Sequence, residues 1–259
     1  MASYRKAQTG CLKFRKSEEI DMNDTTHFMS YERPSVTADV VLFQVHEKII
    51  DKRQKSKKSL RVLLIRRDAE PYAGQWSLPG GFVGINETIE EVARRKVLEK
   101  TGYEQYYLEQ LYTFDGLDRD SRWRVISTAY IGIMKPHAFA KQYGTHSGEW
   151  FEIFGDNTLI GIDTLRTITF DDLAFDHGKI ITKALERIRG KLFYSDIGFE
   201  FEDEKFTVGS LQGTFETILN RPISNFKRTM DGRIEETGET VYGMAYRPAQ
   251  LFRKKNVGV

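Results

Sequence analysis

The sequence has almost no cysteine, no long apolar run and nearly no excess charge. Its 259 residues include one cysteine, Cys11, which excludes an internal disulfide framework and favours a reducing compartment. No apolar run is long enough to cross a bilayer, and Met1 to Lys16 is charged without the apolar region of a secretory signal. We therefore expect a soluble, cytoplasmic protein with no membrane partner.

The formal net charge of +2 is too small to make the whole molecule a nucleic-acid binder. Any contact with nucleic acid must come from a local cluster of basic residues. Hydrophobic residues make up 40% of the chain, enough to bury one core and a smaller second one. We expect two domains after a polar extension over residues 1–34, which ends at Arg33-Pro34.

The first domain, residues 35–191, alternates strand and helix patterns. A helix is predicted over residues 88–100 from apolar residues at helical spacing, with Gly102 as its stop. A second amphipathic helix, residues 178–189, closes the domain, and the lysine-rich segment 48–58 is interpreted as a solvated hairpin tip. The predicted strands are residues 36–45, 60–65, 109–114 and 124–134. This order indicates an α/β sandwich.

The segment from Gly80 to Tyr103 carries the most informative motif. It follows the pattern Gly, five residues, Glu, seven residues, Arg-Glu, an aliphatic residue, any residue, Glu-Glu, any residue, Gly. The matching residues are Gly81, Glu87, Arg95, Val97, Glu99 and Gly102, preceded by Trp76-Ser77-Leu78-Pro79-Gly80. This segment resembles the Nudix box, and the resemblance implies a Nudix α/β/α sandwich.

Two positions depart from the box. In a Nudix hydrolase the helix presents carboxylates at positions i, i+3 and i+4, which hold the Mg²⁺ that activates water. Here those positions are Lys96, Glu99 and Lys100. A like-charge pair at about 4 Å costs roughly 4 kcal/mol at an effective dielectric near 20, so strong Mg²⁺ binding and most hydrolysis should be lost. We expect no catalytic residues, no required cofactor and weak or absent Mg²⁺.

The ammonium groups of Lys96 and Lys100 could instead contact a diphosphate directly. In the alternative, both lysines turn to solvent and Asp118 or Asp120 rebuilds a metal site. Charged groups before the last strand and at the end of an earlier one are further candidates for the pocket wall, with a plain surface loop as the competing interpretation. The predicted effector-binding residues are Arg67, Lys96, Glu99, Lys100, Arg119, Asp120 and Arg122.

The second domain, residues 192–259, predicts a winged helix-turn-helix, so the fold class is α+β. Thr207 caps an apolar-patterned helix that breaks at Arg221-Pro222, and Ser224 caps a second helix over residues 225–230. A hairpin follows over residues 234–240 and 245–253, with Gly238 and Gly243 permitting the turn. From Arg221 to Lys255 bases outnumber acids eight to four. Such folds bind DNA, and they also serve as protein-interaction or dimerisation modules.

The whole chain apart from about the first thirty residues resembles the Nudix-related transcriptional regulators, the NrtR family. Besides the box, the matching stretches are Arg119-Asp120-Ser121-Arg122, Leu173-Ala174-Phe175-Asp176-His177, Phe206-Thr207, Leu211-Gln212, Asn225-Phe226-Lys227-Arg228, Glu236-Thr237-Gly238 and Arg247-Pro248-Ala249. The resemblance implies a homodimer, usually a repressor, that binds a palindromic double-stranded operator and senses ADP-ribose or a related product of NAD turnover. Its predicted DNA-binding residues are Ser224, Asn225, Lys227, Arg228 and Arg247.

Two other functions remain open at this point. The chain could be an active ADP-ribose pyrophosphatase with an accessory C-terminal domain, since Glu87, Glu99 and the box glycines are intact. It could also be an interaction scaffold that binds a nucleotide without touching DNA. The family itself is not uniform, because some relatives govern sugar use and some retain hydrolysis.

Overall fold

The computed structural model describes residues 30–48, 57–136, 148–241 and 248–255. Residues from Pro34 onward form one compact unit. Most of the expected extension over residues 1–34 lies outside the described residues, as do Gly243 and Arg247.

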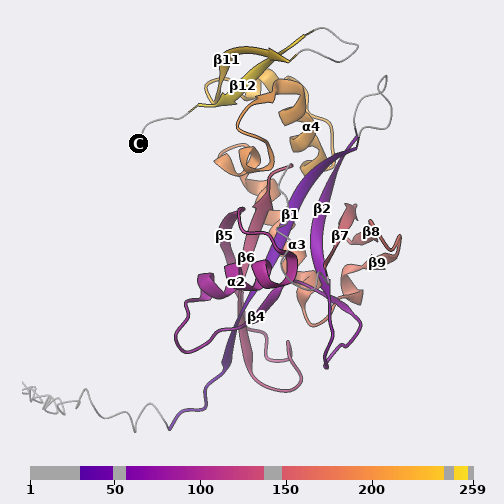
Figure 1. Cartoon of the computed structure of the whole chain (residues 1–259), viewed down its shortest axis with the longest axis vertical. Helices are drawn as coiled ribbons and strands as arrows, with labels where there is room; N and C mark the ends of the chain where they lie inside the picture. Colours follow the sequence, from indigo (N-terminus) through magenta and orange to yellow (C-terminus); the bar gives the residue numbers. More distant parts are fainter. Residues whose placement is uncertain (1–29, 49–56, 137–147, 242–247, 256–259) are drawn as a thin grey trace, which may run out of the picture. The chain divides into compact units, whose positions relative to one another are not determined.

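A mixed sheet forms the centre of this unit (Figure 1). The four predicted strands are confirmed, and β1 pairs in parallel with β6 while the other neighbours are antiparallel. Along the sheet the order is β5 (Tyr107–Phe114), β6 (Val125–Met134), β1 (Ser35–Lys48), β2 (Lys57–Arg66), β7 (Gly148–Phe154), β8 (Thr158–Gly161) and β9 (Thr167–Thr169). Two short strands, β3 (Trp76–Ser77) and β4 (Gly80–Phe82), pair with β2 and β1.

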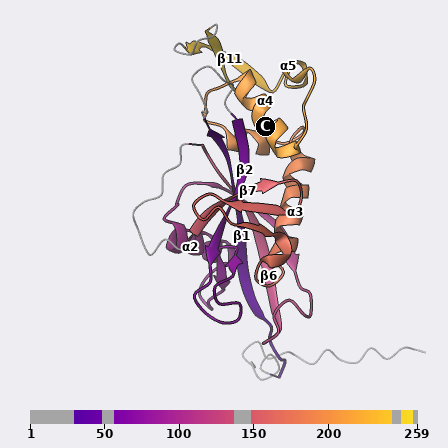
Figure 2. The ribbon, with the colours of Figure 1, turned by 90° about the vertical axis from the view of Figure 1, so that its right-hand side faces the viewer.

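Two helices cover opposite faces of the sheet (Figure 2). Alternate residues of β1 divide between them: Val40 and Leu42 pack with α2 (Ile89–Thr101), whereas Val41 and Phe43 pack with α3 (His177–Lys191). A short 3-10 helix, η1 (Phe170–Asp172), precedes α3. The side-chain period of two in a strand produces this sandwich, as the sequence predicted.

The ends of α2 follow local sequence rules. Thr88 is the N-cap and forms a capping box with Glu91, and Gly102 ends the helix at a φ of 74°. A left-handed conformation of this kind favours glycine because it has no Cβ. The predicted stop at Gly102 is confirmed.

The C-terminal part is a winged helix-turn-helix. Its elements are η2 (Asp196–Phe201), β10 (Phe206–Thr207), α4 (Val208–Leu219), α5 (Phe226–Thr229), β11 (Ile234–Val241) and β12 (Ala249–Lys254), with the strands ordered β10-β12-β11. Thr207 is confirmed as the N-cap of α4, because its hydroxyl accepts a hydrogen bond from the backbone N–H of Ser210 at 3.0 Å.

Two sequence predictions in this part were wrong. Ser224 does not cap the second helix: Asn225, at a φ of 54°, occupies the N-cap position without a side-chain cap bond. Burial of Phe226, whose ring lies 5.2 Å from that of Phe215, anchors this turn instead of a cap. Gly238 lies inside β11 and not in the turn. Its φ of 78° accommodates the shift in strand register between Glu236 and Thr240.

The expected second core is not separate. One apolar cluster runs from the α3 face of the sheet, with Phe43 and Ile188, into the winged helix, with Leu211 and Phe215. The smaller cluster lies under α2 on the other face. The winged helix therefore packs on the sheet through a shared core.

Candidate effector pocket and DNA-reading surface

A cavity of about 260 Å³ lies where β1, the end of β2, β4 and the start of α3 meet. Five of the seven predicted effector-binding residues line it: Arg67, Lys100, Arg119, Asp120 and Arg122. With Arg66 added, five cationic side chains face three aspartates, Asp39, Asp68 and Asp120. This excess of positive charge suits a bound anion.

Arg119 joins three parts of the chain at the pocket floor. Its Nη2 donates to Asp176 Oδ1 at 2.8 Å and its Nε to Asp176 Oδ2 at 3.2 Å, while Nη2 lies 3.6 Å from Asp39 Oδ2. Ser127 also donates to Asp39 Oδ2, at 2.5 Å. Only 5% of the Arg119 side chain is exposed, and charges so buried persist because they are paired. Arg119 thus fixes the floor in place.

His177 completes this floor. Its Nδ1 accepts a hydrogen bond from the backbone N–H of Leu78 at 2.9 Å, so the proton of the neutral ring lies on Nε2, 3.8 Å from Asp39 Oδ1. Burial holds the pKa of His177 below its usual 6.5, and the charge of Asp39 opposes this shift. The sequence had grouped Phe175, Asp176 and His177 in a family stretch without a role.

Asp120 and Arg122 form a pair at the pocket wall. Two nitrogens of the Arg122 guanidinium donate to the Asp120 carboxylate at 3.1 and 2.9 Å, and the Arg122 backbone N–H donates to it at 3.0 Å. The side-chain bond to Arg122 lowers the pKa of Asp120. Asp120 therefore stays ionised and holds the guanidinium of Arg122, whose side chain is 48% exposed, at the pocket wall.

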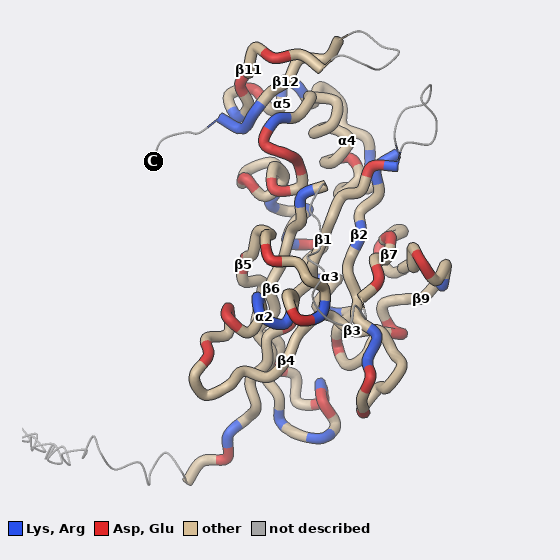
Figure 3. The backbone as a smooth tube through the Cα atoms, viewed as in Figure 1, with Lys and Arg blue, Asp and Glu red and all other residues tan. Residues whose placement is uncertain are grey.

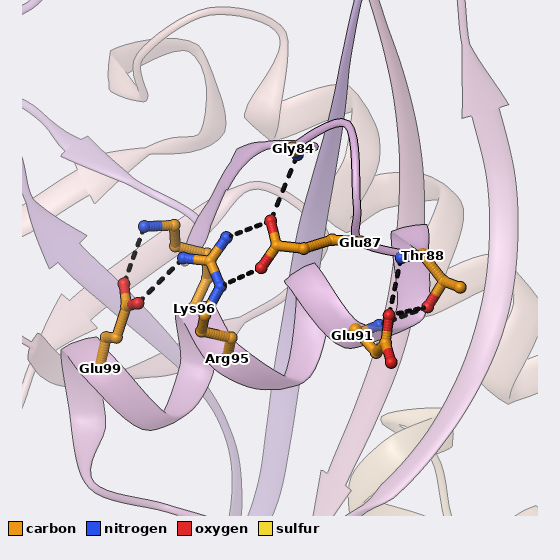
Figure 4. Close-up of polar contacts among 7 residues, drawn as sticks. All are labelled: Gly84, Glu87, Thr88, Glu91, Arg95, Lys96 and Glu99. Carbon is orange, nitrogen blue, oxygen red and sulfur yellow. Dashed lines mark hydrogen bonds and ion pairs between the residues drawn. The ribbon is translucent and has the colours of Figure 1, made fainter.

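The helix α2, which contains most of the Nudix-box residues, carries a chain of ion pairs (Figure 4). Arg95 Nε donates to Glu87 Oε1 at 2.6 Å and Nη1 donates to Glu99 Oε1 at 2.9 Å, and Lys96 Nζ donates to Glu99 Oε2 at 2.7 Å. These bonds, from Arg95 to Glu87 and from Lys96 to Glu99, lower the pKa of both carboxyl groups. Both surviving box carboxylates already have cationic partners.

Two of the predicted effector-binding residues lie outside the cavity lining. Lys96 and Glu99 pair with each other, whereas Lys100 lines the cavity. The Lys96 stem lies across Gly81, since a Cβ at that glycine would lie 2.6 Å from Lys96 Cε. In the part of the chain that the structure describes, no three His, Cys, Asp or Glu side chains group as a metal site requires.

An aromatic wall borders the pocket. The guanidinium carbon of Arg67 lies 4.8 Å from the centre of the Phe175 ring, and Tyr72 meets the same ring edge-on at 4.9 Å. Arg67 Nε also donates to the carbonyl of Pro71 at 2.8 Å. Among the described residues, the buried hydroxyl of Thr37 in the pocket lining has no hydrogen-bond partner. The pocket thus offers flat surfaces and a spare polar group to a ligand.

The DNA-reading candidates gather around α5. Ser224, Asn225, Lys227 and Arg228 are all exposed, and the last three line a groove of about 750 Å³; Arg247 lies outside the described residues. The Lys227 ammonium lies 5.6 Å from the centre of the Phe252 ring. Asp231 and Glu236 also line this groove, so the exposed cations of α5, and not the groove as a whole, suit contact with a polyanion.

The count of eight bases to four acids overstates the positive charge on this surface. Arg233 turns inward and donates to the carbonyl of Phe193 at 2.9 Å, and Arg253 pairs with Glu235 at 2.7 Å. Lys254 pairs with Asp196 at 3.0 Å. The basic positions drawn along α5 and at the end of β12 in Figure 3 are therefore not equivalent, and those of α5 have no carboxylate partner among the described residues.

Two family models match separate parts of the chain. The NUDIX domain model matches residues 45–154, and the NrtR DNA-binding winged helix domain model matches residues 198–253. The ADPR responsive transcriptional repressor NtrR of Acinetobacter baylyi is 32% identical over 231 residues, which cover 86% of this chain and 83% of that protein. The chain belongs to the NrtR family. The predicted combination of a Nudix sandwich and a winged helix is confirmed.

Solved structures of similar proteins cover the same span. The crystal structure of Shewanella oneidensis NrtR complexed with a 27mer DNA is 30% identical, covers 85% of this chain and 93% of its own, and has a TM-score of 0.65. A MutT/nudix family protein from Enterococcus faecalis is 29% identical, covers 89% of this chain and 92% of its own, and has a TM-score of 0.68.

This chain is also similar to an enzyme. The ADP-ribose pyrophosphatase of Methanocaldococcus jannaschii is 29% identical over 167 residues, covering 62% of this chain and 79% of that protein. No helix among the described residues is long and apolar enough to cross a membrane.

Proposed function

We propose that this protein is a cytoplasmic, homodimeric transcriptional repressor that binds a palindromic operator and responds to ADP-ribose or a similar nucleotide diphosphate. Residues 35–191 form the sensor and residues 192–259 the reader. One observation carries the proposal: Lys100 lines the cavity at a position where a Nudix hydrolase places a metal-binding carboxylate. Exposed cations on α5, in a fold that a DNA-bound relative shares, supply the reader.

The ligand chemistry follows from the pocket. Lys100 and Arg122 supply positive charge to a diphosphate, and Arg119 holds the floor beneath it. The flat wall of Arg67 and Phe175 suits a nucleobase. We propose that this chain binds its ligand without Mg²⁺ and without cleaving it, because cations already occupy the surroundings of Glu87 and Glu99.

The response requires two states of the dimer with different operator affinities. A ligand shifts such an equilibrium only by its difference in affinity for the two states. Binding of ADP-ribose at the sensor would favour the state in which the two α5 turns no longer match the operator half-sites. A palindromic operator then loses both contacts together.

A mobility shift on the promoter of the protein's own operon tests this proposal. We expect a retarded complex that weakens at higher salt, and whose operator affinity falls when ADP-ribose is added in EDTA. AMP in place of ADP-ribose is the ligand control. Failure to form a retarded complex on any promoter tried would overturn operator binding. A response to ADP-ribose that requires Mg²⁺ would overturn metal-free sensing.

The second candidate is an ADP-ribose pyrophosphatase, which the similarity to the Methanocaldococcus jannaschii enzyme favours. Incubation with ADP-ribose and Mg²⁺, followed by measurement of AMP, tests it. Rapid metal-dependent release of AMP would establish the enzyme, whereas persistence of ADP-ribose would support a sensor.

A further inference from the structure

Two elements run from the pocket to the winged helix. The helix α3 begins with His177 in the pocket lining, and the chain continues from it through η2 into α4. The strand β2 ends with Ile65 and Arg66 in the same lining. Its other end packs on α4, which Figure 1 shows at the top of the strand. The first connection is covalent, and the second depends on side-chain contacts.

Lys58 makes the polar part of that second connection. Its ammonium lies 2.8 Å from Glu202 Oε1, 2.8 Å from Ser210 Oγ, 3.0 Å from the Ser210 carbonyl oxygen and 2.8 Å from Thr214 Oγ1. Glu202 also accepts hydrogen bonds from both hydroxyls. The side chains of Lys58 and Glu202 are 9% and 5% exposed, so this ion pair is shielded from solvent. An isolated solvated lysine would show none of these contacts.

The Lys58 ammonium constrains the position of the winged helix on the sheet more sharply than the apolar contacts do. Burial of apolar surface in the core shared by the sheet and the winged helix is non-directional, so it constrains the position of the winged helix less sharply than directional hydrogen bonds do. Charge-assisted hydrogen bonds are directional and specify one register. On the α3 side, Arg189 Nε donates to the Ile218 carbonyl at 3.0 Å. The Lys58 cluster supplies a second directional attachment of the winged helix, from β2.

The strand between these two ends is rigid. Backbone hydrogen bonds hold β2 to β1 along one edge, from Phe43 opposite Val62 to Lys48 opposite Lys57. The other edge pairs with β7, from Arg61 opposite Glu152 to Ile65 opposite Gly148. Because both edges are hydrogen-bonded, the pocket end of β2 and its α4 end belong to one rigid part of the sheet.

We propose that Lys58 is the residue through which the effector state of the pocket sets the position of the winged helix. This inference rests on the proposed repressor function and names the route by which its two sites are coupled. Without the Lys58 cluster the protein would still bind ADP-ribose and operator DNA, but each site would lose its effect on the other.

The test replaces the ion pair with apolar side chains of similar length, in the double variant Lys58→Met, Glu202→Met. Such replacements of buried pairs are commonly neutral or stabilising, whereas a single substitution would leave one charge buried alone. The quantity measured is the ratio of operator Kd with and without saturating ADP-ribose. Allosteric ratios commonly lie between about 5 and 150. We expect the ratio to fall below about 2 in the variant, with the Kd for ADP-ribose itself within about twofold of wild type.

Lys57→Met is the matched control, since Lys57 is the exposed neighbour of Lys58, and it should keep the wild-type ratio. Thr214→Val removes one hydroxyl from the cluster and should lower the ratio partially; it replaces the double variant if that variant fails to fold. A wild-type ratio in a folded variant overturns the coupling role of Lys58 alone. A ratio of one in the wild type overturns the proposed repressor function and this inference with it.

Discussion

The pocket and the α5 surface use positive charge in opposite ways. In the pocket, Arg119 is 5% exposed and bound to two aspartates, and Arg122 is held by Asp120. On α5, Lys227 and Arg228 are exposed and have no carboxylate partner within the described residues. The pocket is arranged before its ligand arrives, so it can select by geometry. The α5 cations are solvated, so they attract a polyanion in a way that salt weakens.

The largest effect is expected from removing the buried guanidinium of Arg119. We expect Arg119→Met to lower the free energy of unfolding by about 3–5 kcal/mol, because it leaves Asp39 and Asp176 buried without their cation. Urea unfolding measures this loss. Arg119→Lys, which keeps the charge but not the forked geometry, should lose less. A loss below about 1 kcal/mol for the Met variant would show that the aspartates do not depend on Arg119.

Charge reversal at Lys100 and at Lys96, one turn apart on α2, would distinguish a residue of the cavity lining from a residue outside it. We expect Lys100→Glu to weaken ADP-ribose binding in EDTA by about tenfold to a hundredfold, roughly 1.4–2.8 kcal/mol, because Lys100 lines the cavity. Lys96→Glu is the matched control and should change this affinity far less, since Lys96 lies outside the lining and pairs with Glu99. Calorimetric titration gives both values. Equal effects would place both lysines at the ligand.

A change confined to α5 should leave the sensor intact. We expect Arg228→Ala to weaken operator binding by about tenfold and, if Arg228 contacts a phosphate, to reduce the salt dependence by about one ion. The affinity for ADP-ribose should stay nearly unchanged. Mobility shifts at several salt concentrations, with the exposed Arg253→Ala as a control already paired with Glu235, provide the comparison. Equal loss of both affinities would contradict separate sensor and reader regions.

Local features of the fold could be predicted from the sequence because their causes are local. Gly102 and Thr207 end and begin helices through their own backbone or hydroxyl, and the alternation in β1 assigns its residues to two faces. Ser224 failed as a cap because the burial of Phe226 sets the position of α5. Tertiary packing overrides a capping preference worth only about 1 kcal/mol.

The site was predictable where the motif places it and not where the chain must fold to assemble it. Lys100, Arg119 and Arg122 line one cavity, and their role in effector binding stays a prediction. The contact of Arg119 with Asp176 joins residues far apart in sequence, and no spacing rule reveals it. Lys58 is the clearest case, because it belongs to a lysine-rich segment interpreted as solvated and yet is buried against Glu202.

The smallest expected effect is the contribution of the buried His177 to the pH dependence of stability. Burial depresses the pKa of His177 in the folded state below its ordinary 6.5, so below pH 6.5 the unfolded chain binds a proton that the folded protein does not. Stability is unaffected at pH values well above 6.5 and is lost as the pH falls through 6.5, by less than about 1 kcal/mol between pH 7 and pH 6.

His177→Asn should remove most of this pH dependence, because its amide oxygen can still accept the Leu78 N–H but does not titrate. Burial also lowers the pKa of His46, so His46→Asn is the control for the remaining slope. Urea unfolding at pH 6 and pH 7 measures each difference. If His177→Asn keeps the full wild-type slope while His46→Asn loses it, burial at the pocket floor does not keep His177 neutral in the folded protein.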